Sequence, residues 1–191
     1  MSELLKKFVE LYQKQNFKIT EGFMTVGQAE WFQSFLQKTP SVHKIVEIGF
    51  NGGFSSGVML STRSDLEIVS VDLGLHDYVL PCKTWIDSQF PGRHMLLIGD
   101  SRSVLPRIPH YLKEADVIFI DGGHCDDIPM TDIQNVLRHC RPDAWIIIDD
   151  YIGFAPVVVK AVNDCIKAHQ LHGIQSGEAA DRGWIVCKKI S

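Results

Sequence analysis

Carboxylates stand at the ends of the apolar runs in this chain. One run, DVIFID, ends on Asp121, and a later run, WIIIDD, ends on Asp149 and Asp150. If the two runs are neighbouring strands of a parallel sheet, their acids share the edge where open α/β sheets bind ligands. Three carboxylates do not stay together without a cation or a proton to reduce their charge. They are therefore candidate ligands for Mg²⁺, a hard cation that takes oxygen ligands and keeps several waters.

A histidine follows the first of these acids, in the sequence Asp-Gly-Gly-His that ends at His124. The unperturbed pKa of a histidine, near ~6.5, suits a general base at neutral pH. Asp121 and His124 are therefore the candidate catalytic residues. The alternative is that His124 is a loop histidine or caps the next helix.

The first apolar run, KIVEIG, carries Glu47 and leads into a glycine-containing turn and a helix start. This arrangement allows close backbone approach and provides a helix N-terminus, which suits a nucleotide or a carboxylate. Asp72 ends the next run and is placed to accept hydrogen bonds from ribose hydroxyls. The dinucleotide pattern G-x-G-x-x-G is absent, which argues against a nicotinamide cofactor. The candidate residues of the turn are Gly49, Asn51, Gly53 and Ser55.

The elements that must position these residues alternate between strand and helix. Short runs rich in Ile and Val predict buried parallel strands at 44–49, 66–72, 94–99, 116–121 and 143–149. Helices are predicted at 2–15, from Thr25 to about Gln37, at 53–60, 83–90 and 156–169, and around Ile133–Cys140, with a short one after the third strand. The last two runs, 172–175 and 183–188, are too close for a crossover helix and predict an antiparallel hairpin.

Bulk properties indicate one soluble domain over 1–191, with a helical cap at 1–40 and an α/β core at 44–189. The net charge of -4 and the absence of a basic block argue against nucleic acid as a partner. No apolar stretch reaches membrane-spanning length. Five scattered cysteines without a CxxC pair favour reduced thiols and a cytoplasmic location.

The pattern Glu47-x-Gly49-x-x-x-Gly53-x-Ser55 resembles motif I of class I S-adenosylmethionine (SAM) methyltransferases. Within that superfamily the chain is similar to the metal-dependent O-methyltransferases, such as the catechol, caffeoyl-CoA and macrocin groups. IDDY, which ends at Tyr151, looks most like the macrocin group. The resemblance covers roughly residues 25–189. It implies a Rossmann-like three-layer sandwich with a seven-stranded, mostly parallel sheet and a C-terminal antiparallel hairpin.

The resemblance also implies a role for each matching residue. Glu47 and the turn Gly49–Gly53, which includes Asn51, would face the methionine part of SAM, with Ser55 at its carboxylate. Asp72 would hold the ribose. Asp100 and Ser101 would contact the adenine. Asp121 would touch the cofactor and, with Asp149 and Asp150, bind the metal. His124 stands where the catechol enzymes have a lysine base, which leaves the identity of the base open.

The expected function is therefore SAM- and metal-dependent methylation of a hydroxyl on a small molecule or natural product. A compact chain leaves an open site, or one completed by a second subunit, so a homodimer is expected. Three alternatives stay open: a metal-free methyltransferase acting on nitrogen or another acceptor, a nicotinamide-dependent oxidoreductase, and a SAM-binding protein without transfer activity.

Overall fold

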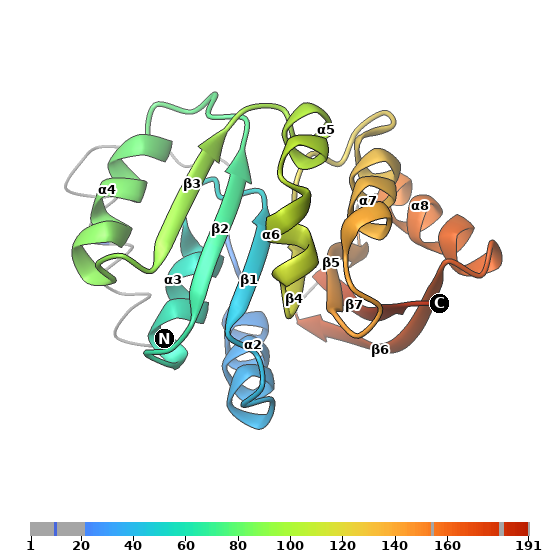
Figure 1. The fold of residues 1–191 in the computed structure, drawn as a ribbon, viewed down its shortest axis with the longest axis horizontal. Helices are drawn as coiled ribbons and strands as arrows, with labels where there is room; N and C mark the ends of the chain where they lie inside the picture. Colours follow the sequence, from blue (N-terminus) through green and yellow to red (C-terminus); the bar gives the residue numbers. More distant parts are fainter. Residues whose placement is uncertain (1–9, 11–21, 154, 180–181, 191) are drawn as a thin grey trace.

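The computed structural model describes residues 10, 22–153, 155–179 and 182–190. Seven strands form one sheet in the order β3-β2-β1-β4-β5-β7-β6 (Figure 1). β1 to β5 pair in parallel, whereas β7 runs antiparallel to both β5 and β6. The predicted mostly parallel sheet with a C-terminal hairpin is therefore confirmed. The strands are β1 Lys44–Ile48, β2 Glu67–Asp72, β3 His94–Ile98, β4 Val117–Ile120, β5 Trp145–Ile152, β6 Leu171–Ala179 and β7 Arg182–Lys189.

Helices cover both faces of the sheet, which makes the three predicted layers (Figure 1). On one face α2, α3 and α4 pack into a buried cluster that includes Phe32, Met59 and Ile86. On the other face α6, α7 and α8 pack into a second cluster that includes Leu112 and Ile133. The helices are α2 Val26–Lys38, α3 Phe54–Thr62, α4 Val79–Gln89, α5 Ser101–Val104, the 3₁₀ turn η1 Leu105–Arg107, α6 Pro109–Glu114, α7 Ile128–His139 and α8 Pro156–Lys167.

The central strands bury side chains on both faces, as parallel strands covered by helices do. In β1, Ile45 belongs to the first cluster, whereas Val46 and Ile48 belong to the second. Glu47 is the exception, because it is a fully buried carboxylate in an otherwise apolar strand. The N-cap predicted at Thr25 is also present, since its hydroxyl accepts the backbone N–H of Gln28 at 3.2 Å.

Several predicted boundaries differ from the structure. The helix predicted at 2–15 lies outside the described residues. Pro81, expected in an irregular segment, lies in the first turn of α4, where a missing N–H costs no helical hydrogen bond. β6 begins at Leu171 and is longer than the predicted run 172–175.

β5 does not end at the acids. It continues to Ile152 with a shift of register between Ile148 and Ile152, and Asp150 has a positive φ of 57°. Asp149 and Asp150 therefore lie within an irregular stretch of the strand. Such a bulge is a common way to redirect a side chain next to a functional site.

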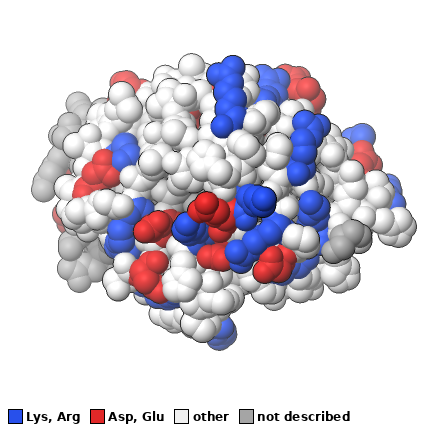
Figure 2. All heavy atoms as spheres, in the orientation of Figure 1, with Lys and Arg blue, Asp and Glu red and all other residues white. Residues whose placement is uncertain are grey.

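The distribution of charge on the surface agrees with the composition of the chain. Charges of both signs are interleaved on the face seen in Figure 2, with no basic stripe. Among the described residues, no helix is both long enough and apolar enough to cross a membrane. All five cysteines are free, and only Cys125 is exposed.

Candidate functional site

A large cavity of about 300 Å³ opens at the carboxyl ends of the parallel strands. Its walls come from the segments that follow β1, β2, β3 and β4, from the bulge of β5 and from the start of β7. This is the edge at which open α/β sheets bind ligands. The predicted site residues that line this cavity are Gly49, Asn51, Ser55, Asp72, Asp100, Ser101, Asp121, His124, Asp149 and Asp150.

The turn after β1 approaches β4 so closely that only glycine fits at Gly49. This residue has a φ of +95°, and a Cβ built on it would lie 2.0 Å from the carbonyl oxygen of Asp121. Gly53, with a φ of 74°, is the N-cap of α3 and does not line the cavity. The two glycines therefore bring the N-terminus of α3 and the loop after β4 to the same cavity.

Asp72 fixes the shape of this turn. One of its oxygens, Oδ2, accepts the backbone N–H groups of Phe50 at 2.9 Å and Asn51 at 2.8 Å. The other, Oδ1, accepts the N–H of Gly74 at 2.7 Å. Asp72 thus links the end of β2 to the turn after β1. Its predicted contact with a ribose would use the lone pairs that these bonds leave on Oδ1.

Glu47 lies beneath the turn rather than on the cavity wall. It is fully buried, and its carboxylate accepts hydrogen bonds from the hydroxyls of Ser55, Ser56 and Ser70. Burial raises its pKa, and the three hydroxyl bonds oppose the rise. The structure thus places serine hydroxyls around Glu47, and its predicted direct contact with the cofactor stays a prediction.

On the adenine side of the predicted site, Asp100 caps α5. Its Oδ1 accepts the N–H of Arg102 at 2.9 Å, and its Oδ2 lies 2.7 Å from the guanidinium of Arg102. This pairing lowers the pKa of Asp100 and keeps it ionised. Arg102 also reaches Asp127 at 3.2 Å. The arginine joins the loop after β3 to the loop after β4.

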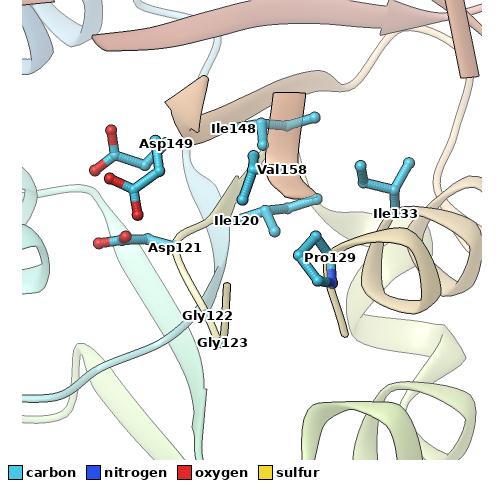
Figure 3. Close-up of a pocket in the computed structure, with 10 residues that line it drawn as sticks. Ile120, Asp121, Gly122, Gly123, Pro129, Ile133, Ile148, Asp149 and Val158 are labelled. Atoms are coloured by element: carbon cyan, nitrogen blue, oxygen red, sulfur yellow. The ribbon is translucent and has the colours of Figure 1, made fainter. Parts of the chain in front are cut away.

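The three predicted metal ligands line the same cavity. In Figure 3 the carboxylates of Asp121 and Asp149 lie on one side, and the apolar residues Ile120, Ile148 and Val158 lie on the other. Between these residues is a small cavity of about 10 Å³, room for about one water. The acids thus line the large cavity and rest on an apolar floor.

Burial and mutual repulsion disfavour the ionised forms of these acids. The pKa of Asp121 is raised well above its ordinary value by burial and by the charges of Asp149 and Asp150. Burial raises the pKa of Asp149 to about 6, and the charge of Asp150 adds to the rise. One buried oxygen of Asp149, Oδ1, has no hydrogen-bond partner among the described residues. Added positive charge would favour the ionised forms.

Two residues near the acids are not among the predicted site residues. The amide of buried Gln28, on α2, lowers the pKa of Asp149, and the guanidinium of Arg182 lowers the pKa of both Asp121 and Asp149. Arg182 lines the cavity from the start of β7. In the sequence, nothing marks Gln28 as a site residue beyond its position in the first turn of α2.

The partners of Glu47 were also missed. Ser70 pairs with Glu47 in the register of β1 and β2, and its hydroxyl lies 2.9 Å from Nε2 of His94. Ser70 interrupts the apolar run LEIVSVD, and that polar residue was the available signal.

Comparison with known proteins supports the assignment of the fold. The profile of a family described as Methyltransferase domain matches residues 46–151. No protein of curated function matches the chain in sequence. An O-methyltransferase from Bacillus cereus, solved with S-adenosylhomocysteine (SAH), superimposes with a TM-score of 0.78 at 16% identity, covering 99% of this chain and 92% of that chain.

Two further solved structures share the fold. An SAH-bound methyltransferase from Podospora anserina gives a TM-score of 0.79 at 14% identity, covering 100% of this chain and 89% of that chain. A methyltransferase of the mycinamycin biosynthetic pathway, solved with Mg and SAH, gives 0.60 at 18% identity, covering 95% of this chain and 55% of that chain. The matched segment 46–151 is more than half of the chain and contains the glycine turn, Asp72, Asp100 and all three acids. The chain therefore belongs to the methyltransferase domain family and has the Rossmann-like fold of SAM-dependent methyltransferases.

Proposed function

We propose that this protein transfers the methyl group of SAM to a hydroxyl of a small molecule, with the help of a divalent cation such as Mg²⁺. The observation that carries the proposal is that two groups of residues line one cavity. Asn51, Ser55 and Asp72 form the first group, and Asp121, Asp149 and Asp150 form the second.

The first group suits the cofactor. The turn after β1 and the N-terminus of α3 offer backbone N–H groups, and Asp72 offers a carboxylate for the ribose. Asp100 and Ser101, which line the same cavity, would contact the adenine. The Bacillus cereus and Podospora anserina proteins, which hold SAH in this fold, support the same assignment.

The second group suits an acceptor hydroxyl. Most of the rate enhancement in a methyl transfer comes from holding the hydroxyl oxygen in line with the sulfonium methyl. Asp121 and Asp149 would position the acceptor group, and His124, on the cavity wall, would accept its proton.

The donor set fits Mg²⁺ in its chemistry, because the ion favours carboxylate oxygens and needs only one or two of them. The raised pKa values and the unpaired Asp149 oxygen also favour an added cation. In the part of the chain that the structure describes, no three His, Cys, Asp or Glu side chains converge on a ready-made metal site. When bound, the ion would lower the pKa of the acceptor hydroxyl.

A metal-free methyltransferase is the second candidate, and Arg182 favours it. Its guanidinium lines the cavity and offsets part of the negative charge of Asp121 and Asp149. In that case the acids would be structural, and the acceptor could carry a nitrogen. Sensitivity of turnover to EDTA separates the two candidates.

Both candidate functions require that the protein binds SAM. Thermal stabilisation by SAH is a simple test of that binding. We expect the melting temperature to rise with SAH concentration, because a ligand that binds only the folded state stabilises it by mass action. No shift at millimolar SAH would count against both candidates.

The partners follow from the same site. We propose a small hydroxylated acceptor rather than nucleic acid, a cytoplasmic location consistent with free cysteines, and a homodimer that could close the open cavity. Sedimentation of the protein with and without SAH tests the last point.

A further inference from the structure

One ion pair connects two walls of the large cavity. Arg102 lines the cavity from the segment after β3, and its guanidinium lies 3.2 Å from the carboxylate of Asp127, at the end of the loop after β4. In the sheet, β2 and β1 lie between β3 and β4. The pair therefore spans the carboxyl ends of two strands, at the edge where Figure 1 shows α5 and the loop that leads to α7. We call Arg102 and Asp127 the strap.

The Arg102 half of the strap is fixed. Asp100 accepts the backbone N–H of Arg102 at 2.9 Å, and its other oxygen accepts the guanidinium Nη2 at 2.7 Å. These bonds direct the guanidinium, and its remaining nitrogen, Nη1, donates to Asp127. Arginine suits this role because its planar group presents several donors in a fixed geometry. A motion that opens the strap is therefore expected on the Asp127 side.

The loop that carries Asp127 is packed at its base and exposed beyond it. A Cβ on Gly122 would lie 3.1 Å from the side chain of Ile48, so the start of the loop packs against β1. Residues 123–127 are exposed. Asp126, next to the strap, has a φ of 50°, a conformation that costs energy in a non-glycine residue. Few buried contacts and local strain are the properties of loops that open.

We propose that the strap controls the passage of the cofactor: it holds the loop after β4 across the cavity, and SAM and SAH enter and leave while it is open. This inference rests on the proposed function, which supplies the ligand. The loop also carries His124, so the closed strap keeps the candidate base at the cavity wall. Because the two side chains are 40% and 72% exposed, the pair adds little stability and opens readily.

Asp127→Asn tests the proposal by separating rates from affinity. The variant removes the charge but keeps a residue type that caps helices at the N-cap of α7. We expect the association and dissociation rate constants for SAH, measured by surface plasmon resonance at low salt, to rise together by about two- to fivefold. The Kd should stay unchanged, because the strap restrains the loop in the free and the bound protein alike. A structural defect would weaken the Kd instead.

Asp126→Asn is the matched control. It makes the same change of charge one residue away, Asp126 forms no ion pair with a described residue, and asparagine tolerates the positive φ. Both rate constants should match those of wild type. Salt is the second control: at about 1 M the Debye length is about 3 Å, so the rate constants of wild type should approach those of Asp127→Asn. Asp127→Glu, which keeps the charge, should stay close to wild type.

A nitroxide label gives a readout that needs no ligand. Cys125 lies in the loop and is the exposed one among five cysteines, so a thiol reagent labels this position in the folded protein. In Asp127→Asn the label should become more mobile in the electron paramagnetic resonance spectrum, and in Asp126→Asn it should not. High salt should raise the mobility in wild type and leave Asp127→Asn unchanged.

The outcomes are separable. If SAH does not bind the folded wild-type protein, the proposed function fails, and the label alone decides whether the pair holds the loop. If SAH binds but Asp127→Asn weakens the Kd without raising the association rate constant, or leaves either the rate constants or the label mobility unchanged, the inference about the strap is wrong. Thermal melts establish that each variant is folded, and the salt dependence of wild type decides the question if Asp127→Asn is not.

Discussion

Asp72 and Asn51 are joined by a hydrogen bond of 2.8 Å between a side-chain oxygen of one and the backbone N–H of the other. Asn51 has a positive φ of 46°, a conformation that a non-glycine residue holds only with support. The acid predicted to bind a ribose therefore also shapes the turn predicted to bind the rest of the cofactor. On this prediction, both stability and cofactor binding depend on the Asp72 carboxylate.

Asp72→Ala is the first test of this dual role. It leaves the N–H groups of Phe50, Asn51 and Gly74 without their acceptor, so we expect the free energy of unfolding to fall by about 1–3 kcal/mol. SAH affinity should fall more than about tenfold, because the ribose contact is also lost. Asp143→Ala, which removes an exposed acid, is the control for both measurements. Normal SAH affinity in Asp72→Ala would contradict the assignment.

Asp132 gives a prediction about pH. It is fully buried on α7, and neither carboxylate oxygen has a hydrogen-bond partner of good geometry among the described residues, although Ser101 lies near enough to lower its pKa. Burial raises the pKa to about 6. Because the folded-state pKa is raised, ionisation destabilises the protein as the pH rises from about 4 to about 6, by at most on the order of 3 kcal/mol.

Asp132→Asn should remove this penalty. We expect the variant to gain stability relative to wild type as the pH rises from 4 to 7, and denaturant unfolding at several pH values measures the gap. A gap that does not change with pH would mean that Asp132 does not titrate in this range.

Asp149 links stability to cation binding. Its raised pKa of about 6 means that the folded protein resists its ionisation, so Asp149→Asn should stabilise the apo protein at pH 7.5. The same variant should lose Mg²⁺ or Mn²⁺ binding, since a bound cation needs the ionised carboxylate. In wild type the cation should bind more tightly at pH 7.5 than at pH 5.5. Retained turnover of Asp149→Asn in EDTA would favour the metal-free candidate.

His124 is tested by separating binding from turnover. His124→Gln should lower kcat by about 10²–10⁴-fold, the usual contribution of a general base, with little change in SAH affinity. Cys125→Ser, at the adjacent exposed position, is the matched control and should leave both unchanged. The rate at which SAH forms from SAM in the presence of a hydroxylated acceptor measures kcat. Unchanged kcat in His124→Gln would assign the proton transfer to another group.

The sequence predicts the fold well because its signals are local. Runs of Ile and Val mark each parallel strand, and the pattern from Thr25 to Gln28 marks the start of α2. The missed features depend on pairing between distant segments. The bulge at Asp150 forms where β5 pairs with β7, and such a shift of register has no local signature.

The functional site shows the same contrast between local signals and contacts of distant segments. Glycines and strand-end acids predict a cavity and most of its lining, because the carboxyl ends of parallel strands meet at one edge. The burial of Glu47 under Ser55 and Ser70 depends on strand register and on the packing of α3. The approach of Gln28 to Asp149 depends on how α2 packs, and a single sequence does not specify that contact.

The most direct test of the central claim is isothermal titration of the wild-type protein with SAH, in the presence and absence of Mg²⁺. The account predicts saturable binding with one site per chain, weakened by Asp72→Ala and unaffected by Asp143→Ala. Absence of SAH binding to the folded protein under both conditions would contradict it.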